Sequence, residues 1–226
     1  MAEILIQYKD VEICRDENII LQAVDFRLHS GEFLYIVGKV GSGKSTLLKT
    51  FYADIPVESG QARIFDWDLR KIKSKQIPTL RRQIGIVFQD FQLMTDRSVN
   101  ANLEFVLKST GWKDKNEIRE RIKEVLNQVG MSNKGYKTPY ELSGGEQQCI
   151  VIARALLNSP KIILADEPTG NLDAESGNKI VQLLHNICAG GTAVIMTTHN
   201  QQLVQQFPAE ILKCEERRLI PAALCL

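Results

Sequence analysis

Residues Leu142–Gln148 read LSGGEQQ, a glycine turn at the start of an expected helix. The turn lies between a glycine-rich phosphate loop upstream and a strand downstream that ends in two acids. Free backbone N–H groups at a helix N-terminus attract phosphate oxygens, so this turn predicts an anion site in a chain that already has one. The sequence therefore predicts two nucleotide half-sites in a single chain.

The upstream phosphate loop is Gly38–Ser45, GKVGSGKS, which fits the pattern G-x-x-x-x-G-K-[ST]. It follows Phe33–Val37, expected to be a buried strand, and precedes Lys44–Tyr52, expected to be a helix, so a chance match is improbable. Glycines let the backbone curl until its N–H groups point at phosphate oxygens. Lys44 is expected to bind the β- and γ-phosphates, and the Ser45 hydroxyl is short enough to bind Mg²⁺. The residues expected to bind nucleotide here are Gly38, Lys39, Val40, Gly41, Ser42, Gly43, Lys44, Ser45 and Thr46.

The acidic strand end is Ile162–Glu167, IILADE. Burying an unpaired charge is costly, so adjacent acids at the end of a buried strand indicate a chemical role. Asp166 is expected to join the metal shell, directly or through water, and Glu167 to polarise the attacking water as a general base. Acids are common where strands end, so the motif is weak alone, and its position after LSGGEQQ is what strengthens it.

Composition limits the classes of function. The chain has 226 residues, 44% of them hydrophobic, and its 28 basic and 27 acidic residues give a net charge of +1, so no global charge favours nucleic acid. No apolar run approaches the about 20 residues that span a bilayer, and we expect no signal peptide. If the protein works at a membrane, another chain must hold it there. Scattered cysteines without a CxxC pair favour reduced thiols in a cytosolic compartment: Cys14, Cys149, Cys188, Cys214 and Cys225.

Apolar patterning predicts an α/β fold with a mostly parallel sheet covered on both faces. Residues from about 90 to 157 differ, because amphipathic helical patterns such as Asn116–Val129 replace strands there. We therefore expect one domain over residues 1–226, with a core of about 1–89 and 158–226 and a helical subdomain inserted at about 90–157. The other expected strands are Ile4–Tyr8, Val24–Leu28, Gln61–Leu69, Ile84–Phe88, Ile162–Leu164 and Ala193–Thr197.

These motifs occur in the order and spacing of the ABC-type ATPases, which essentially the whole chain resembles. The resemblance implies an ABC-type nucleotide-binding domain, with a P-loop core sheet, N-terminal antiparallel strands and an inserted helical subdomain. It also implies a head-to-tail homodimer that binds two ATP molecules with Mg²⁺. Each ATP would lie between the phosphate loop of one subunit and Ser143, Gly144, Gly145 and Glu146 of the other.

The resemblance implies roles for three further sites. His199 stands where the family has a histidine that contacts the γ-phosphate and the attacking water, so it joins Glu167, Lys44 and Gln89 as an expected catalytic residue. Gln89 matches the family's glutamine that ligates the metal with Ser45 and Asp166 and senses the γ-phosphate. A lone histidine or glutamine at a strand end is usually inert, so both assignments depend on the neighbouring motifs. The loop expected to cross the dimer interface is Asn171, Leu172 and Asp173.

Within the family, three longer stretches resemble the bacterial cell-division ATPases: Leu80–Val99, Ser143–Gln148 and Leu164–Asp173. This resemblance implies an FtsX-like integral membrane partner that docks after Gln89, a peripheral position at the cytoplasmic face of the inner membrane, and control of peptidoglycan hydrolysis. ATPases of lipoprotein release and macrolide export share SGGEQQ and LADEPTGNLD, so an exporter subunit is the alternative. A soluble ABC protein of translation or DNA repair and a regulator without turnover fit less well.

Two positions depart from the family. Near Cys14 the family usually has an aromatic side chain that stacks on adenine, and a thiol has no π-face. Cys149 stands where arginine is common after GEQQ, and a thiol cannot match the hydrogen bonds of a guanidinium. Neither position supplies the hydrolysis chemistry, so ATPase activity is still expected.

Overall fold

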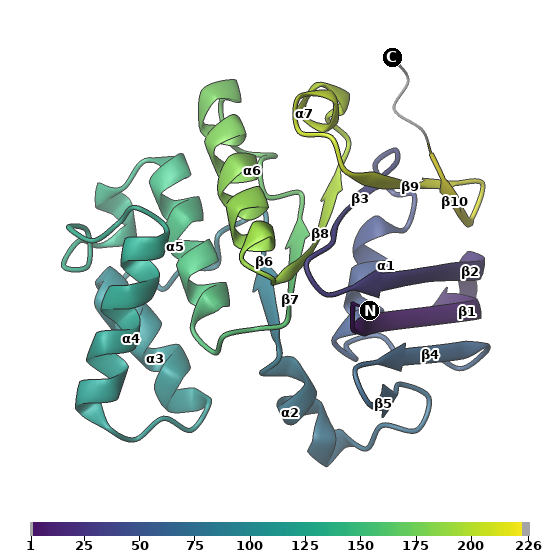
Figure 1. Ribbon diagram of the computed structural model, residues 1–226, viewed down its shortest axis with the longest axis horizontal. Helices are drawn as coiled ribbons and strands as arrows, with labels where there is room; N and C mark the ends of the chain where they lie inside the picture. The colour runs from purple at the N-terminus through teal and green to yellow at the C-terminus, as the bar shows by residue number, and fades with distance from the viewer. Residues whose placement is uncertain (1, 223–226) are drawn as a thin grey trace.

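Two β-sheets and the helices packed on them make up residues 2–222, the part of the chain that the computed structural model describes (Figure 1). The strands are β1 Ile4–Arg15, β2 Asn18–His29, β3 Phe33–Val37, β4 Gln61–Ile64, β5 Trp67–Asp68, β6 Ile84–Val87, β7 Ile162–Asp166, β8 Ala193–Thr198, β9 Glu210–Glu215 and β10 Arg218–Pro221. The α-helices are α1 Lys44–Phe51, α2 Ile77–Arg81, α3 Val99–Ser109, α4 Lys115–Gln128, α5 Gly144–Leu156, α6 Ala174–Ala189 and α7 Gln201–Gln206. Two 3₁₀ turns, Ser74–Gln76 and Pro139–Glu141, complete the described elements.

The larger sheet has the order β10-β9-β3-β8-β7-β6. Its strands from β9 to β6 are parallel, and β10 adds an antiparallel edge as a hairpin with β9. Side chains on β3 are buried on alternate faces, with Phe33 and Tyr35 in one apolar cluster and Leu34 and Ile36 in the other. Burial on both faces explains why this strand is a continuous apolar run.

Helices and the smaller sheet cover the two faces of the larger sheet. One face packs against α5 and α6, and α3 and α4 lie beyond α5 in the same cluster, at the left of Figure 1. The other face packs against α1, which is itself covered by the antiparallel sheet β2-β1-β4-β5. The helices α1 and α5 therefore lie on opposite faces of the larger sheet.

The predicted fold class is confirmed, with two local differences. The expected single strand Gln61–Leu69 is split into β4 and β5 by a turn, because Phe65 adopts a left-handed backbone with φ 50°. The two N-terminal strands run longer than expected, since β1 and β2 pair antiparallel from Ile4 with His29 to Arg15 with Asn18.

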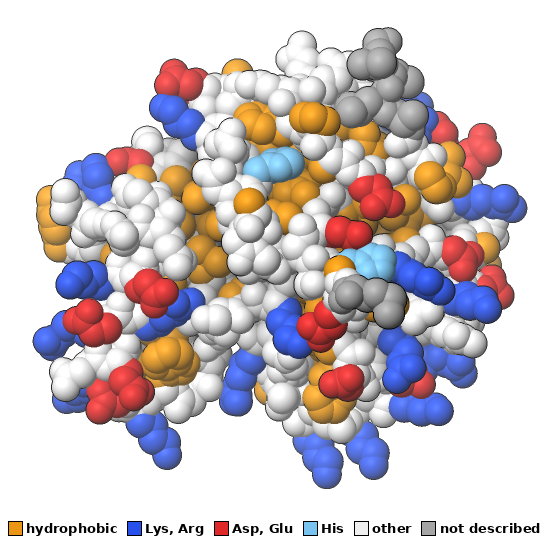
Figure 2. Space-filling view, in the orientation of Figure 1, with side chains coloured by type: hydrophobic (Ala, Val, Ile, Leu, Met, Phe, Trp, Pro, Cys, Tyr) orange, Lys and Arg blue, Asp and Glu red, His pale blue; other side chains and the backbone are white. Residues whose placement is uncertain are grey.

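The surface charges are mixed, as the nearly equal numbers of basic and acidic residues lead one to expect, and the described cysteines are unpaired. On the face shown in Figure 2, basic and acidic side chains are interspersed. Within residues 2–222, no helix is long and apolar enough to cross a membrane. The four described cysteines (Cys14, Cys149, Cys188 and Cys214) are free thiols, while Cys225 lies outside the described residues.

Candidate active site

The expected active-site residues follow four neighbouring parallel strands. The phosphate loop follows β3, Gln89 follows β6, Glu167 follows β7, and His199 follows β8. Because these strands are parallel, their carboxyl ends share one edge of the sheet, where ligands bind in open α/β folds. The tertiary structure thus gathers side chains that are as far apart as residues 44 and 199 in the sequence.

The phosphate loop leaves the N-terminus of α1 free to bind an anion. Each of α3, α4, α5, α6 and α7 begins with a side-chain cap, from Ser98, Asp114, Ser143, Asp173 and Asn200 respectively. In contrast, α1 has Gly43 at its N-cap position and no side-chain cap, a feature that among the described α-helices it shares only with the five-residue α2. The first N–H groups of a helix need acceptors, and phosphate oxygens are suitable ones.

Two glycines of the loop are needed for its shape. A Cβ atom on Gly38 would lie 2.6 Å from Ser42 Oγ and 2.7 Å from the Cys214 carbonyl oxygen. Gly43 has φ 101°, in the left-handed region, and a Cβ there would meet Ile20 at 2.7 Å. Ser42 Oγ is buried and has no hydrogen-bond partner within the described chain. A bound phosphate is the natural acceptor for such an orphaned hydroxyl, so the loop fits the nucleotide.

The carboxylate of Asp166 links the phosphate loop to β8. Ser45 Oγ donates to Asp166 Oδ1 at 3.0 Å, so the structure brings these two expected metal ligands together. Thr197 Oγ1 donates to the same oxygen at 2.7 Å, and it accepts from the Glu167 N–H at 2.9 Å. A hydroxyl and a carboxylate at this separation supply the oxygen ligands that Mg²⁺ prefers.

Glu167 lies between two of the three other expected catalytic side chains, Lys44 and His199. Its Oε1 is 3.3 Å from the Lys44 ammonium, and its Oε2 is 2.9 Å from His199 Nδ1. Lys44 also donates to the carbonyl oxygens of Gly38 and Lys39, at 2.9 and 3.2 Å. Lys44 is buried and Glu167 is 14% exposed, so both charges are largely removed from water and depend on each other.

Gln89 lies at the edge of this constellation. Within the described chain its side-chain amide makes no hydrogen bond to Ser45 or Asp166, and it lies against Gly170, where a Cβ would be 2.7 Å from Gln89 Nε2. The backbone carbonyl oxygen of Gln89 accepts from Asn171 Nδ2 at 3.0 Å. The structure therefore places Gln89 with the predicted interface loop rather than with the predicted metal ligands.

The predicted interface loop also contacts the glycine turn of LSGGEQQ. Leu172 Cδ2 would be 3.3 Å from a Cβ on Gly144, so the two segments are packed closely. Asp173 caps α6 by accepting from the Ser176 N–H at 2.9 Å, and these hydrogen bonds lower the pKa of its carboxyl group. Asn171 and Asp173 are exposed, as an interface requires.

The glycine turn has two backbone N–H groups, those of Gly144 and Gly145, that no acceptor of the described residues occupies. Ser143 Oγ accepts from the Glu146 N–H, and the Glu146 carboxylate accepts from the Ser143 N–H at 2.9 Å, which forms a capping box. No hydrogen bond engages the Gly144 or Gly145 N–H within the described residues. Because α1 and α5 cover opposite faces of the sheet, the turn and the phosphate loop belong to different parts of the molecule.

The two departures have clear structural settings. The Cys14 thiol makes only a 3.7 Å contact with Glu12, and Tyr8 is buried with its hydroxyl 2.9 Å from Thr50 Oγ1, so Tyr8 cannot replace the missing aromatic side chain. Cys149 packs against the larger apolar cluster, the one that contains Phe33 and Tyr35 of β3, and burial raises the pKa of its thiol to about 11. A neutral thiol suits this apolar position on α5.

Sequence reasoning missed three side chains that organise the site. Thr197 joins Asp166 to the Glu167 backbone. Arg154 donates to the carbonyl oxygens of Phe91 and Gln92 at 2.9 and 2.5 Å, and Gln148 donates to that of Phe88 at 3.3 Å. For Thr197 and Arg154 the available signal was a polar residue within an apolar stretch, because burying a polar group without a partner is costly.

Comparison with known proteins gives matches along the chain. A family model described as ABC transporter matches residues 21–170. The cell division ATP-binding protein FtsE of Streptococcus pneumoniae is 41% identical over 200 residues, which cover 88% of this chain and 86% of that protein. FtsE of Escherichia coli K12 is 38% identical over 199 residues, covering 88% and 89% respectively.

Solved structures share the whole architecture. CbiO1 of Clostridium perfringens, part of the ABC transporter complex cbiONQ, superposes with a TM-score of 0.89 at 28% identity, over 96% of this chain and 87% of that one. The ATP-binding cassette MJ0796, a dimer in a post-hydrolysis state bound to ADP and Pi, gives a TM-score of 0.84 at 32% identity, over 97% and 99%.

Proposed function

Because the chain belongs to the ABC transporter family of ATPases and, within it, to the FtsE group, we propose that it hydrolyses ATP as a head-to-tail homodimer bound to an FtsX-like membrane protein. ATP hydrolysis is the activity of the family. In this proposal the dimer is peripheral at the cytoplasmic face of the inner membrane. Its closure on ATP is passed to the membrane partner and controls peptidoglycan hydrolysis in cell division.

The contacts of Glu167 are the observation that carries the proposed chemistry. The same carboxylate meets Lys44 on one oxygen and His199 on the other. With ATP in the loop, the Lys44 ammonium pairs with the β- and γ-phosphates instead of with Glu167. Glu167 and His199 then orient the attacking water. Catalysis then depends on positioning and on neutralising the charge of the transferred phosphoryl group.

Mg²⁺ fits the oxygen ligands of the site. Ser45 and Asp166 would hold the ion, with Gln89 as a further ligand after a movement of its side chain from Gly170. A bound Mg²⁺ would neutralise negative charge on the phosphate oxygens. The hydrogen bond from Thr197 keeps the Asp166 carboxylate directed at the phosphate loop, with or without Mg²⁺.

The homodimer follows from the separation of the two half-sites. Free N–H groups of Gly144 and Gly145 cap the γ-phosphate held by the partner's phosphate loop in this proposal. The dimeric structure of the MJ0796 cassette, which is 32% identical to this chain, supports a dimer. The inserted residues of about 90–157 then act as a helical subdomain that presents the glycine turn to the other subunit.

Mixing two inactive variants tests the dimer. Lys44→Ala removes the phosphate-loop charge, and Ser143→Arg blocks the glycine turn, so each homodimer has two defective sites. A mixed dimer combines both defects in one site and leaves the other intact, so mixing should restore phosphate release. Ser74→Arg, at another exposed serine, is the control and should stay active. Full activity of Ser143→Arg alone would exclude the shared site.

The membrane partner is tested on the segment after Gln89. Phe91 and Leu93 pack against the larger apolar cluster, so their replacement would disturb the fold, whereas Gln92, Thr95 and Asp96 are exposed. Charge-changing substitutions of these three should abolish co-purification with the FtsX-like protein and leave ATP binding intact. The control is a pair of reversals on α6, Glu175→Lys and Lys179→Glu, which exchange the members of one exposed ion pair. Unchanged co-purification would remove this docking assignment.

A further inference from the structure

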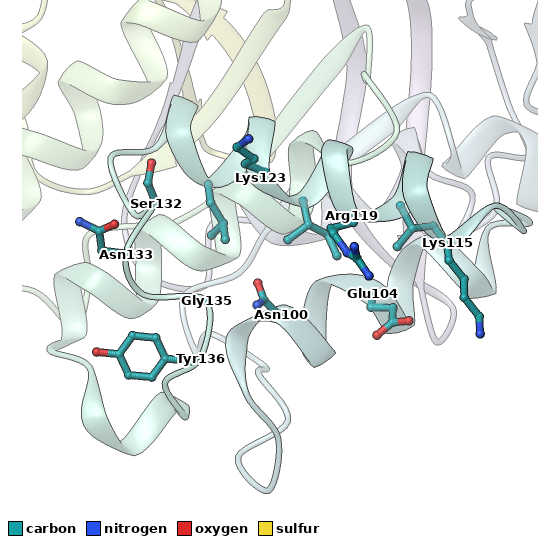
Figure 3. A pocket seen from close by; sticks show the side chains of 12 residues that line it. Asn100, Glu104, Lys115, Arg119, Lys123, Ser132, Asn133, Gly135 and Tyr136 are labelled. Atoms are coloured by element: carbon teal, nitrogen blue, oxygen red, sulfur yellow. The ribbon is translucent and has the colours of Figure 1, made fainter.

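A groove runs between α3 and α4, away from the ATP site. It has a volume of about 670 Å³, and its apolar floor is formed by Ile118, Ile122 and Leu126 of α4. Figure 3 shows α4 along one side, Asn100 and Glu104 of α3 on the other, and the segment of Ser132 to Tyr136 at one end. None of the phosphate-loop, acidic-strand or glycine-turn residues lines it.

Three cations follow the α4 wall at a spacing of four residues. Lys115, Arg119 and Lys123 are all exposed. They share one helix face because residues four positions apart are neighbours on a helix surface. Lys115 and Arg119 have no ion pair within residues 2–222, and Lys123 has only a 4.0 Å contact with Glu120. The acids of α4 at positions 117, 120 and 124 do not line the groove. Three of the four positive side chains of α4 therefore stand along the groove, and the fourth, Arg121, donates instead to Leu156 and Leu157.

The spacing of these cations selects the kind of anion. From Lys115 to Lys123 the helix rises about 12 Å, so one small anion cannot contact all three. A protein segment with successive carboxylates on one face and apolar side chains on the other matches both the cations and the floor. Asn100 and Asn133 can pair with its backbone, because no hydrogen bond occupies either side-chain amide in the described structure.

A membrane surface fits the groove less well. Anionic lipid headgroups present a flat surface, whereas these cations border a hollow whose opposite wall includes Glu104. Glu104 is paired with Lys108 at 2.6 Å, so its negative charge is largely balanced and does not bar an anionic ligand from the groove. The concave shape favours a segment that inserts apolar side chains.

The groove is joined to the glycine turn through one ion pair. Lys134 lies between two lining residues, Asn133 and Gly135, and its ammonium is 2.7 Å from Glu146 Oε1 on the first turn of α5. That contact raises the pKa of Lys134 and lowers that of Glu146. The Gly135 carbonyl oxygen also accepts from the Asn100 N–H at 2.8 Å. A ligand that shifts this loop therefore acts directly on LSGGEQQ.

We propose that the α3–α4 groove binds an acidic amphipathic segment of a protein partner and that binding modulates ATP hydrolysis through Lys134 and Glu146. The partner's carboxylates pair with Lys115, Arg119 and Lys123, and its apolar side chains cover the floor. This docking surface is separate from the segment after Gln89 that the membrane partner is proposed to use.

The probe is a fluorescent helical peptide with glutamates on one face and leucines on the other. Anisotropy should report saturable binding to the full chain that weakens with salt, and the peptide should change the rate of phosphate release. The charge-reversal variant K115E/R119E/K123E should weaken binding about tenfold or more, with basal ATPase activity retained. The variant K71E/K73E/K75E has the same change of net charge at another exposed site and should bind as the unmodified chain does.

Further measurements separate the groove from general charge attraction. A peptide with lysines in place of glutamates should not bind. Lys134→Met should leave peptide affinity within about twofold and remove the effect on hydrolysis, because it breaks only the link to Glu146. The proposal is overturned if both triple variants weaken binding equally. It is also overturned if phosphatidylglycerol vesicles bind through the three cations while the peptide does not.

Discussion

The Lys44 ammonium and the Glu167 carboxylate form an ion pair of 3.3 Å between the phosphate loop and the end of β7. Lys44 is the expected partner of the nucleotide phosphates, so ATP must compete with Glu167 for this charge. Once Lys44 has moved to the phosphates, Glu167 keeps its contact with His199 at 2.9 Å and faces the attacking water. Nucleotide binding and release of the general base are therefore one event in the proposed mechanism.

Replacing Glu167 by glutamine should separate binding from hydrolysis. The amide keeps the shape of the side chain but has no charge to hold Lys44 and no basicity to polarise water. ATP affinity should be retained or increased, and phosphate release should fall by about 10²–10⁴. Equilibrium nucleotide binding and size-exclusion chromatography with ATP check both, since a dimer that cannot turn over should accumulate. Turnover at the normal rate would reject the role of Glu167.

Removal of the Lys44 charge should abolish nucleotide binding. Lys44→Ala leaves Glu167 without its ion-pair partner in a largely buried place and leaves the loop without its cation. The matched control is Lys39→Ala, which keeps the backbone groups through which this loop residue is expected to act, including the carbonyl oxygen that accepts from Lys44. Nucleotide titration by calorimetry should show loss of ATP binding for Lys44→Ala alone. Tight binding by that variant would contradict the phosphate-loop assignment.

The hydroxyl of Thr197 should prove to be a positioning group. Thr197→Val keeps the volume but removes the acceptor for the Glu167 N–H and the donor to Asp166. Loss of these buried partners should cost about 1–3 kcal/mol of unfolding free energy and lower kcat more than it raises KM. Thr197→Ser retains the hydroxyl and should recover most of kcat. Equal kcat values for the valine and serine variants would exclude this role.

Arg154 should hold the strained segment after Gln89. Phe91 and Gln92 both have left-handed backbones, with φ 56° and 50°, and Arg154 donates to both carbonyl oxygens. Arg154→Lys replaces the planar guanidinium by an ammonium that cannot reach both carbonyl oxygens in the same way. The substitution should lower the free energy of unfolding by about 1–2 kcal/mol. Hydrogen exchange of residues 90–94 should then become faster.

A second arginine provides the control for Arg154. Arg121 donates in the same way to the carbonyl oxygens of Leu156 and Leu157, at the C-terminal end of α5. Arg121→Lys should lower stability by a similar amount without faster exchange in residues 90–94. If both variants change that segment alike, the effect comes from global destabilisation and not from the Arg154 contact.

Cys214 should make the fold sensitive to high pH. Burial raises the pKa of its thiol to about 11, whereas an unfolded thiol titrates near about 8.5. Between these values the unfolded chain loses a proton that the folded chain keeps, so stability falls as pH rises from about 9 to 11. The contribution to the unfolding free energy is on the order of 3 kcal/mol. Urea unfolding across this range should show a shallower decline for Cys214→Ala, and identical slopes would refute the linkage.

The sequence by itself predicts which segments hold the chemistry. Local rules were sufficient for Gly38–Ser45, because a strand, a glycine loop and a helix N-terminus make a phosphate site from consecutive residues. The apolar run of β7 ending at Asp166 was visible for the same reason. The single expected strand at Gln61–Leu69 was wrong in detail, since the left-handed turn at Phe65 has no strong local signal.

Only the tertiary structure decided how these segments meet. The order of β6, β7, β8 and β3 in the sheet brings Glu167 between Lys44 and His199, and sequence spacing contains no information on that order. The contacts of Thr197 and Arg154 likewise join residues separated by more than 25 positions. Such pairings arise from the packing of whole elements, because the free energy of a buried polar group depends on neighbours that the chain supplies only once it has folded.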